Sequence, residues 1–492
     1  MKTTYIKSLA ALLLAGSLAS CGDKFLETDM FGQVDSATAL NNVENIGYAL
    51  NGAYYALSYY EFAGTEATIW GDLASDVTYW NQKSAHFNDL YQFQPKNTSV
   101  LLKDVWEYGY KVIDNATRII VAAEDLAPTL KNEEEVALLK RYQAEAHALR
   151  AYAELVLVNG FAHQVKVNGK DYSAEPGIVL VSTPVGANDN VKRSTVGETY
   201  TAIENNLSKA LQLFDEAGEY SEELVYFTPA AVKGLQARVY LYEEKWAEAA
   251  QAAKDALELG NVSELVITPT AYRSLYNGGG SNYESFFYLA IDQQTNWSAN
   301  SSGTIWSTYS YSPSPWLSSV MAEDDCRRAV WGYSSDSTPN IPIFTGGKFQ
   351  NLSGNPAVGT CYLINAPEMF LIQAEAALQQ NKVTEAANYL LAVAKRNPAI
   401  TSTADLPSDK DGLYSFLKDE RARELFQEGH RLWDLRRWGK GANIYATGAP
   451  SVKWTFSNYN VSDCVYPIPD DEINTGAGVT QNSGWQSTFP NL

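Results

Sequence analysis

The chain has 492 residues, of which 45% are hydrophobic and 12% aromatic, and its formal net charge at pH 7 is −20. Such an acidic surface makes nucleic acid and anionic lipid headgroups unfavourable partners. Beyond the N-terminus no stretch approaches the roughly 18 apolar residues of a membrane span, so we expect a soluble body large enough for a substantial core.

The first residues predict a lipoprotein signal. Lys2 and Lys7 precede an apolar run at residues 9–15, and Leu18-Ala19-Ser20-Cys21 follows that run. The segment is too short and wrongly flanked for a membrane span, which indicates a secretory signal. A cysteine in this Leu-small-small setting matches the bacterial lipobox, and acyl chains on it would hold the protein stably on a membrane. We therefore expect residues 1–20 to be removed and Cys21 to be lipidated. The alternative is an ordinary secreted protein with a chance cysteine at this position.

Long helices are predicted in the N-terminal half of the chain. Apolar residues recur at helical spacing in three stretches, which are residues 42–58, 100–123 and 133–158. The tetrapeptide Thr195-Val196-Gly197-Glu198 matches a capping box and predicts a helix that runs to about Ala217. These patterns predict a mostly α-helical fold.

Residues 229–259 and 367–394 have the spacing of tetratricopeptide helix pairs. In the first segment, small residues such as Ala237 and Ala249 accompany the aromatic Trp246. Small residues are needed where two helices cross closely, and large ones fill the space where helices diverge. The second segment repeats the pattern more weakly. We expect tetratricopeptide-like helix pairs in both places, and two unrelated helical hairpins are the alternative.

Between residues 260 and 361 the sequence becomes rich in loops. Glycine, asparagine and serine cluster there, and prolines such as Pro313 and Pro315 are expected to break helices. A second aromatic-rich region spans residues 62–96. A sugar ring has an apolar face that stacks on an aromatic ring, while its hydroxyls bond to polar side chains. The candidate ligand-binding residues are therefore Trp80, Asn81, Trp297, Trp306, Tyr309, Trp316 and Trp331. A core or loop-anchoring role is the alternative for each of these aromatic residues.

Several blocks of the chain resemble the SusD/RagB family. The matching blocks are Arg141–Gly160, Glu420–Gly439, and the C-terminal pair Tyr466–Glu472 and Gln481–Trp485. The gapless match over Glu420–Gly439 is the most specific, and with the lipobox and the helix pairs the resemblance covers nearly the whole chain. Gln143, His147 and Gln373 depart from the usual motifs without threatening the fold. The loops between the blocks match nothing in the family, so the identity of a ligand does not carry over.

The resemblance implies a SusD-like fold in which tetratricopeptide-like helix pairs support a loop-rich binding face. It implies one domain over residues 21–492, with a helical scaffold at about 40–260 and 362–440, a loop-rich segment at about 260–361 and a C-terminal signature at 464–492. It further implies a Bacteroidota outer-membrane lipoprotein that faces outward and covers a SusC-like TonB-dependent transporter. Most members bind glycans and some bind peptides. The usual position of the family's ligand aromatics favours Trp80 and Asn81.

The charged block at residues 420–439 predicts a structural role rather than catalysis. Acids and arginines that lie three and four residues apart form ion pairs within a helix, each contributing roughly 0.3 kcal/mol. Arginines of this block also suit carboxylates and carbonyls where loops meet the helix. The four histidines show no metal-binding spacing, and no GxSxG nucleophile motif occurs.

We therefore expect a non-catalytic protein, without a metal or cofactor, that captures oligosaccharides and delivers them to the transporter. A peptide-capturing lipoprotein of the RagB kind is the first alternative. An extracellular glycoside hydrolase is a second, since the many acids include pairs that could reach the separation that such enzymes need. Cys326, Cys361 and Cys464 are compatible with one disulfide and one thiol or with three thiols.

Overall fold

A computed structural model describes most of the chain from Ala39 onward. The described residues are 39–80, 84–186, 188–277, 282–309, 311–333, 344–349, 354–439 and 464–489, together with the strands at 443–445 and 452–455. This part is mostly helical, which confirms the expected fold class, and its strands form two-stranded antiparallel sheets. None of the helices in these ranges is both long enough and apolar enough to cross a membrane. Cys21 and Asn81 lie outside the described residues.

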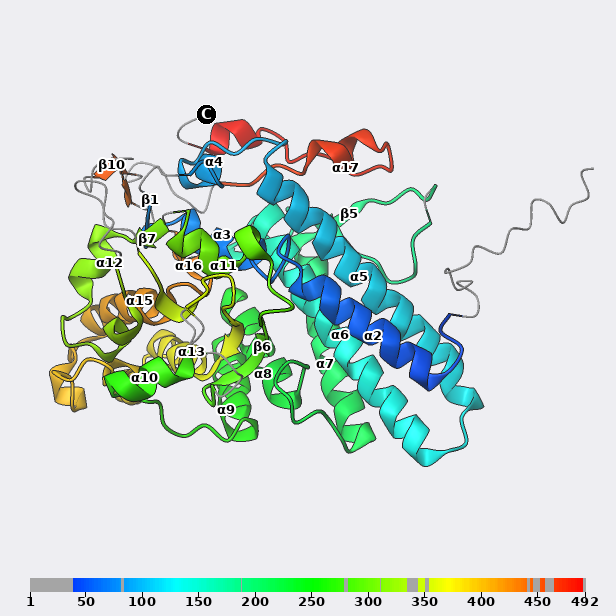
Figure 1. The fold of residues 1–492 in the computed structure, drawn as a ribbon, viewed down its shortest axis with the longest axis horizontal. Coiled ribbons are helices and arrows are strands. Elements are labelled where there is room, and N and C mark those ends of the chain that lie inside the picture. The colour runs from blue at the N-terminus through cyan, green and yellow to red at the C-terminus, as the bar shows by residue number, and fades with distance from the viewer. Residues whose placement is uncertain are drawn as a thin grey trace, which may run out of the picture.

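Long helices from the N-terminal half lie along one side of the molecule (Figure 1). They are α2 (Val43–Ser58), α5 (Val100–Leu126), α6 (Glu133–Phe161) and α7 (Val196–Ala217). The predicted capping box is present at the start of α7, where Thr195 and Glu198 bond to each other's backbone N–H groups. Asn42 caps α2 in a related way, because its side-chain oxygen accepts the N–H of Asn45 at 2.8 Å.

Two helix pairs occupy the segments predicted to be tetratricopeptide-like. The first consists of α8 (Pro229–Tyr242) and α9 (Trp246–Leu259), and the second of α13 (Ala366–Gln379) and α14 (Val383–Ala394). Ala237 and Ala249 are fully buried, as expected where two helices cross closely. Helix α13 packs against α9 and against α15 (Lys410–Leu425), so the two pairs form one helical scaffold.

The loop-rich segment contains short elements that are held onto this scaffold. They include α10 (Pro269–Leu275), β6 (Ser285–Leu289), α11 (Ser302–Ser307), β7 (Tyr311–Pro313), α12 (Pro315–Val320) and β8 (Cys361–Asn365). Strands β6 and β8 pair with each other, and β7 pairs with β1 (Thr78–Trp80), so that Trp80 faces Tyr311. The expectation that Pro315 breaks a helix was wrong. It is the first residue of α12, where its missing N–H costs nothing.

The remaining elements are small. Helices α3 (Glu66–Leu73), α4 (Asn88–Tyr91), α16 (Arg431–Arg437) and α17 (Asp470–Asn474) are short. The small sheets pair β2 (Lys166–Val167) with β3 (Lys170–Asp171), β4 (Pro176–Val179) with β5 (Arg193–Thr195), and β9 (Asn443–Tyr445) with β10 (Val452–Thr455).

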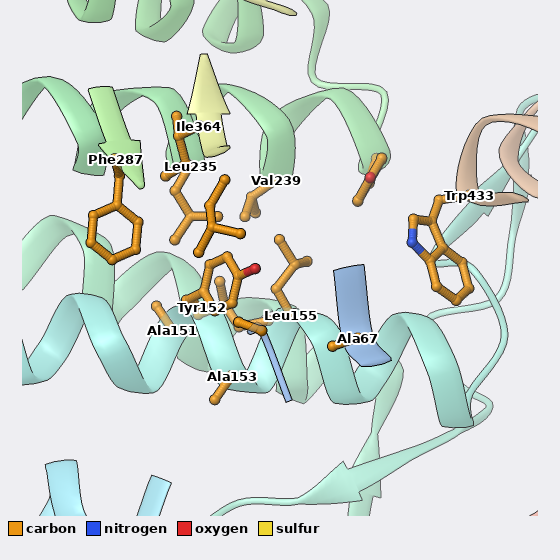
Figure 2. Packing of buried hydrophobic residues seen from close by; sticks show 14 of the residues in the cluster. Ala67, Ala151, Tyr152, Ala153, Leu155, Leu235, Val239, Phe287, Ile364 and Trp433 are labelled. Atoms are coloured by element: carbon orange, nitrogen blue, oxygen red, sulfur yellow. The ribbon is translucent and has the colours of Figure 1, made fainter. Parts of the chain in front are cut away.

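The core joins the long helices to the helix pairs. Figure 2 shows Tyr152 and Leu155 of α6 pointing toward Leu235 and Val239 of α8, beside Ile364 of β8. All five side chains are buried, with at most 6% of their surface exposed. Burial of such side chains contributes about 1.5–3 kcal/mol each and is the main term that holds the two halves together.

Residues from both ends of the chain enclose Trp70 of α3, whose side chain is fully buried. Its ring centroid lies 5.5 Å from Phe161 and 5.5 Å from Trp433. Tyr466, close to the C-terminus, approaches the same indole edge-on at 4.8 Å. The C-terminal segment is therefore part of the core around an N-terminal residue.

Candidate functional site

The charged block at residues 420–439 is structural, as expected, but most of its ion pairs run between elements rather than along one helix. Arg421 binds Asp434 at 2.7 Å, and Arg437 binds Glu375 of α13 at 2.7 Å. Within one helix, Arg437 also lies 2.9 Å from Asp434. These side chains are almost completely buried. The expectation of intrahelical pairs was therefore only partly right, because sequence spacing shows which residues share a helix face but not which helix packs against it.

Arg436 shows the other role expected for this block. Its guanidinium donates to the carbonyl oxygens of Asn159 and Ala162 at the end of α6, at 2.5 and 2.8 Å. Those carbonyls have no partner within the helix, so the arginine satisfies them. Arg436 thus joins α16 to the end of α6.

Two of the histidines, His147 and His430, and the cysteines of the described residues are also buried. Burial lowers the pKa of His147 to about 4 and that of His430 to about 3, so both imidazoles are neutral near pH 7. Cys326, Cys361 and Cys464 are free thiols, and burial raises the pKa of the first two to about 12. Among the described residues, no group of three or more His, Cys, Asp or Glu side chains is placed to hold a metal ion.

Two of the aromatic residues predicted to bind ligand are core residues. Trp306 is fully buried, and its ring centroid lies 5.0 Å from that of Phe426. Trp80 is 6% exposed, donates its indole N–H to the carbonyl of Ser84 at 2.9 Å and packs edge-on against Tyr91. Neither presents a ring face to solvent, so for these two the packing alternative replaces the binding expectation. Burial of a large aromatic side chain stabilises the fold more than exposure of its ring to solvent does.

Three further predicted residues anchor loops. Trp316 is half-buried under the guanidinium of Arg431, 4.9 Å from the ring centroid. Trp331 is half-buried and packs edge-on against Phe344. Tyr309 is half-buried and its ring lies 4.1 Å from the imidazole of His86. Each of these rings has a packed neighbour that ties its loop to another part of the chain.

Trp297 is the predicted residue that joins a partly exposed group of rings. We name this group the aromatic platform, and it consists of Tyr55, Tyr59, Tyr60, Tyr108 and Trp297. Tyr59 is at its centre, with ring centroids 4.8 Å from Tyr108 in a stacked arrangement and 4.4 Å from Trp297. Tyr60 stacks on Tyr59 at 5.7 Å, and Tyr55 meets Tyr59 edge-on at 5.6 Å. Tyr55 is 59% exposed and the other four rings are half-buried.

Three separate elements build the platform. Tyr55 lies in the last turn of α2, and Tyr59 follows that helix as its C-cap residue in an extended conformation. Tyr108 belongs to α5, which packs beside α2. Trp297 comes from the loop after β6, and its indole N–H donates to the carbonyl of Ser58 at 2.9 Å. That bond also satisfies a carbonyl at the open end of α2, so the loop is fixed to the helix terminus.

Acidic side chains surround the platform. Burial, together with the nearby charges of Glu61 and Glu107, raises the pKa of Asp104 to about 6. Burial and the charge of Glu61 also raise the pKa of Tyr108 to about 12, so its hydroxyl remains protonated. Lys111 lies 4.6 Å from the centroid of the Tyr108 ring. Flat apolar rings beside carboxylates and phenol hydroxyls can stack on a ring and accept or donate hydrogen bonds around it.

The tyrosines of the platform were not among the predicted site residues. Tyr55 belongs to the stretch predicted as a helix over residues 42–58, and Tyr59 directly follows it. A signal was present for Tyr55, which lies on the side of the helix away from buried residues such as Ile46, Leu50 and Leu57. Aromatic residues on the polar face of an amphipathic helix are unusual and indicate a use outside the core.

The described residues define a mostly α-helical protein with two helix pairs and a partly exposed group of aromatic rings. Two family models match the chain, one described as the SusD family over residues 362–485 and one as "Starch-binding associating with outer membrane" over residues 24–241. The two models match separate stretches of the chain, and the chain is SusD-like. Residues 242–361, which include Trp297, fall outside both matched ranges.

Relatives and solved structures agree with this placement. The chain is 22% identical to SusD-like protein P38 of Formosa agariphila, with 88% of this chain and 91% of the relative covered. A SusD superfamily protein from Bacteroides vulgatus superimposes with a TM-score of 0.78 at 24% identity, over 90% of this chain and 99% of that one. A SusD-like carbohydrate binding protein from the same species gives a TM-score of 0.73 at 18% identity, over 92% and 99% of the two chains. At these identities the solved structures establish the fold.

Proposed function

We propose that this protein captures oligosaccharides on the aromatic platform at the outer surface of the outer membrane and passes them to a SusC-like TonB-dependent transporter. No bond of the ligand is broken. In this proposal residues 1–20 are removed, Cys21 carries the lipid anchor, and residues 21–492 act as one domain. The observation that carries the proposal is the platform itself, a group of five rings from the end of α2, from α5 and from a loop, in which Tyr55 is 59% exposed and the other four rings are half-buried.

The chemistry of a sugar fits this surface. The apolar face of a pyranose ring stacks on an indole or phenol, and its hydroxyls bond to carboxylates such as Asp104 and Glu107 around the platform. Tyr59 is held between Tyr108 and Trp297, so little conformational entropy is lost when a ligand binds. Trp297 is fixed in addition by its bond to Ser58.

The comparisons support the sugar class and the location. One matched family model is described as starch-binding and as associating with the outer membrane. One solved neighbour is named a carbohydrate binding protein. The lipobox around Cys21 supports a lipid anchor. The partner transporter rests on the family resemblance alone.

The test uses the protein from Gly22 onward, titrated calorimetrically against starch, cellulose, xylan and β-glucan oligosaccharides, with the products checked by chromatography. We expect saturable binding without cleavage, and a loss of about 2 kcal/mol of binding free energy in Trp297→Ala or Tyr59→Ala. Tyr220→Ala is the matched control, because this tyrosine is 50% exposed and lies outside the platform. Binding of peptides in place of sugars, or the appearance of shorter sugars, would contradict the proposal.

The anchor and the partner need separate tests in the native host. Labelled palmitate should enter the wild-type protein and not Cys21→Ser, and protease added to intact cells should remove the wild-type protein from the surface. A tagged form should co-purify with a TonB-dependent transporter from detergent-solubilised outer membranes. Purification without such a transporter would contradict the delivery step.

A further inference from the structure

Three carboxylates lie beside the aromatic platform. We name them the acidic cluster, which consists of Glu61, Asp104 and Glu107. Asp104 precedes Glu107 by three residues and Tyr108 of the platform by four, so it is a neighbour of both on the surface of α5. Glu61 directly follows Tyr60 of the platform, and burial together with the Glu61 carboxylate raises the pKa of the Tyr60 hydroxyl. The cluster and the platform therefore form one surface.

Two lysines near the acidic cluster do not neutralise it. Lys103 pairs with Asp471 at 2.6 Å, and Lys111 lies 4.6 Å from the centroid of the Tyr108 ring. Among the salt bridges of the described residues, none includes a carboxylate of the cluster. The cluster therefore keeps an excess of negative charge.

A fourth carboxylate approaches the acidic cluster from inside the protein. Glu66, in the first turn of α3, is 3% exposed, and its Oε2 atom is buried without a hydrogen-bond partner among the described residues. Its backbone N–H donates to the carbonyl of Tyr60 at 2.9 Å, which fixes it beside the platform, and α3 packs against α5. Burial raises the pKa of Glu66 well above its usual range, and the charges of Asp104 and Glu61 add to this shift. Glu66 therefore faces the cluster with part of its bonding capacity unused.

An ammonium group is the ligand that matches both parts of this surface. A buried carboxylate without a partner is costly, and a cation beside it favours its charged form. A metal ion needs several converging oxygen ligands, and among the described residues no three acidic, His or Cys side chains are placed to hold one. An ammonium needs fewer acceptors and is also attracted to the face of an aromatic ring, which the half-buried Tyr59 and Trp297 offer nearby. Carboxylate or sulfate groups on a ligand would be repelled by the cluster.

We propose that the acidic cluster and Glu66 form a subsite for a protonated amine, so that the preferred ligand of the platform is an oligosaccharide that contains amino-sugar units. This inference rests on the proposed function, because it places the amine on a sugar ring that stacks on the platform. The amine donates hydrogen bonds to the carboxylates of Asp104 and Glu61 at the surface, and Glu66 adds negative charge from inside the protein.

The experiment compares three tetrasaccharides with the same β-1,4 linkage on the protein from Gly22 onward. They are built from glucose, N-acetylglucosamine and glucosamine, and so carry a hydroxyl, an acetamide or an amine at the same carbon atom. At a pH where the amine is protonated, calorimetry in low salt should show roughly tenfold tighter binding of the glucosamine tetramer than of the glucose tetramer. Added salt should reduce this ratio, because it screens charges.

Variants of the subsite test which residues produce the ratio. Asp104→Asn and Glu66→Gln, which remove a charge at nearly constant shape, should bring the ratio of the two affinities close to one. Glu248→Gln, on the exposed face of α9, is the matched control and should keep the wild-type ratio. Glu66→Gln should not lower the melting temperature, because the carboxylate that it replaces has a buried oxygen without a partner.

The outcomes separate this inference from the proposed function. Equal affinity for the three tetrasaccharides would overturn the amine subsite and leave the platform as a site for neutral sugars. A preference for glucosamine that persists in Asp104→Asn and Glu66→Gln would overturn it as well. Binding of none of the three would also overturn it, and the starch, xylan and β-glucan oligosaccharides would then decide whether the platform binds sugars at all. Tighter binding of tetralysine than of the glucosamine tetramer would assign the surface to basic peptides and overturn both proposals.

Discussion

The charged block at residues 420–439 and the aromatic platform differ in how much of their surface the fold leaves open to solvent. In the block, Arg421, Asp434 and Arg437 are nearly inaccessible to solvent and bind one another or Glu375. In the platform, the rings of Tyr55 and Trp297 keep part of their surface open. The difference shows that a cluster of charged or aromatic side chains can bind a ligand only where some of its polar groups or ring surface remain open to solvent.

The largest expected effect is on the block. Arg421→Ala removes a bidentate partner of Asp434, whose oxygens accept at 2.7 and 3.0 Å, and leaves a buried carboxylate with less compensation. The free energy of unfolding should fall by about 3–5 kcal/mol in urea titrations. Lys254→Ala, which breaks the exposed pair with Glu258, is the control and should cost below about 0.5 kcal/mol. Equal losses in the free energy of unfolding in both variants would contradict the structural importance of the buried ion pair.

The second prediction contrasts two tryptophans of the loop-rich segment. Trp306→Ala opens a cavity in the core and should lower the free energy of unfolding by about 3–5 kcal/mol. Trp297→Ala should cost much less stability, because this indole is half-buried, yet it should weaken oligosaccharide binding by about 2 kcal/mol. Thermal unfolding gives the stability of each variant, and calorimetry gives its free energy of oligosaccharide binding. If Trp306→Ala were the variant that lost affinity without losing stability, the platform would be the wrong site.

The third prediction concerns pH. Burial raises the pKa of Glu154 to about 7, partly offset by Arg150 and by a hydrogen bond from Asn206 at 3.0 Å. The folded state therefore binds this proton more tightly than the unfolded state, in which a glutamate titrates near 4.3. Its contribution to stability is complete below about pH 4 and is lost as the pH rises toward 7. Glu154→Gln should lack this loss in urea titrations between pH 4 and 8, and an unchanged slope would assign the dependence to other groups.

Asp434 should act in the opposite direction, which gives a control inside the charged block. Arg421 and Arg437 hold its pKa at about 2 against the effect of burial. Its stabilising contribution is therefore present above about pH 4, where the unfolded aspartate is also ionised, and is lost as the pH falls toward 2. Asp434→Asn should be destabilised at neutral pH and should approach the wild type in acid.

The smallest expected effect is at Gly52 on α2. Gly52→Ala should raise the free energy of unfolding by roughly 0.5–1 kcal/mol, because the added methyl group meets no neighbour and alanine favours a helix. The variant should bind disaccharides as the wild type does. A loss of stability, measured in the same urea titrations, would show that this face of α2 is packed rather than open.

Much of the scaffold could be predicted, because the helical spacing of apolar residues can be recognised within a single segment. The stretch predicted at 42–58 is α2 at Val43–Ser58, and the capping box at Thr195 begins α7. The platform could be predicted only through Trp297. Nothing local to Tyr59 shows that a loop more than two hundred residues later will lie over it, just as nothing local to Arg437 indicates Glu375 of another helix. Contacts between distant segments are decided by tertiary packing.

The environment of Trp70 also constrains the order in which the molecule can form. Its indole is enclosed by Phe161, by Trp433 and by Tyr466, which lies almost four hundred residues further along the chain. Contacts of such high sequence separation slow folding, because the entropy of closing the loop is lost before the contact is gained. The core around Trp70 therefore stays incomplete until the segments that carry Trp433 and Tyr466 pack against it. A chain truncated before Trp433 should remain open around Trp70 and be prone to aggregation.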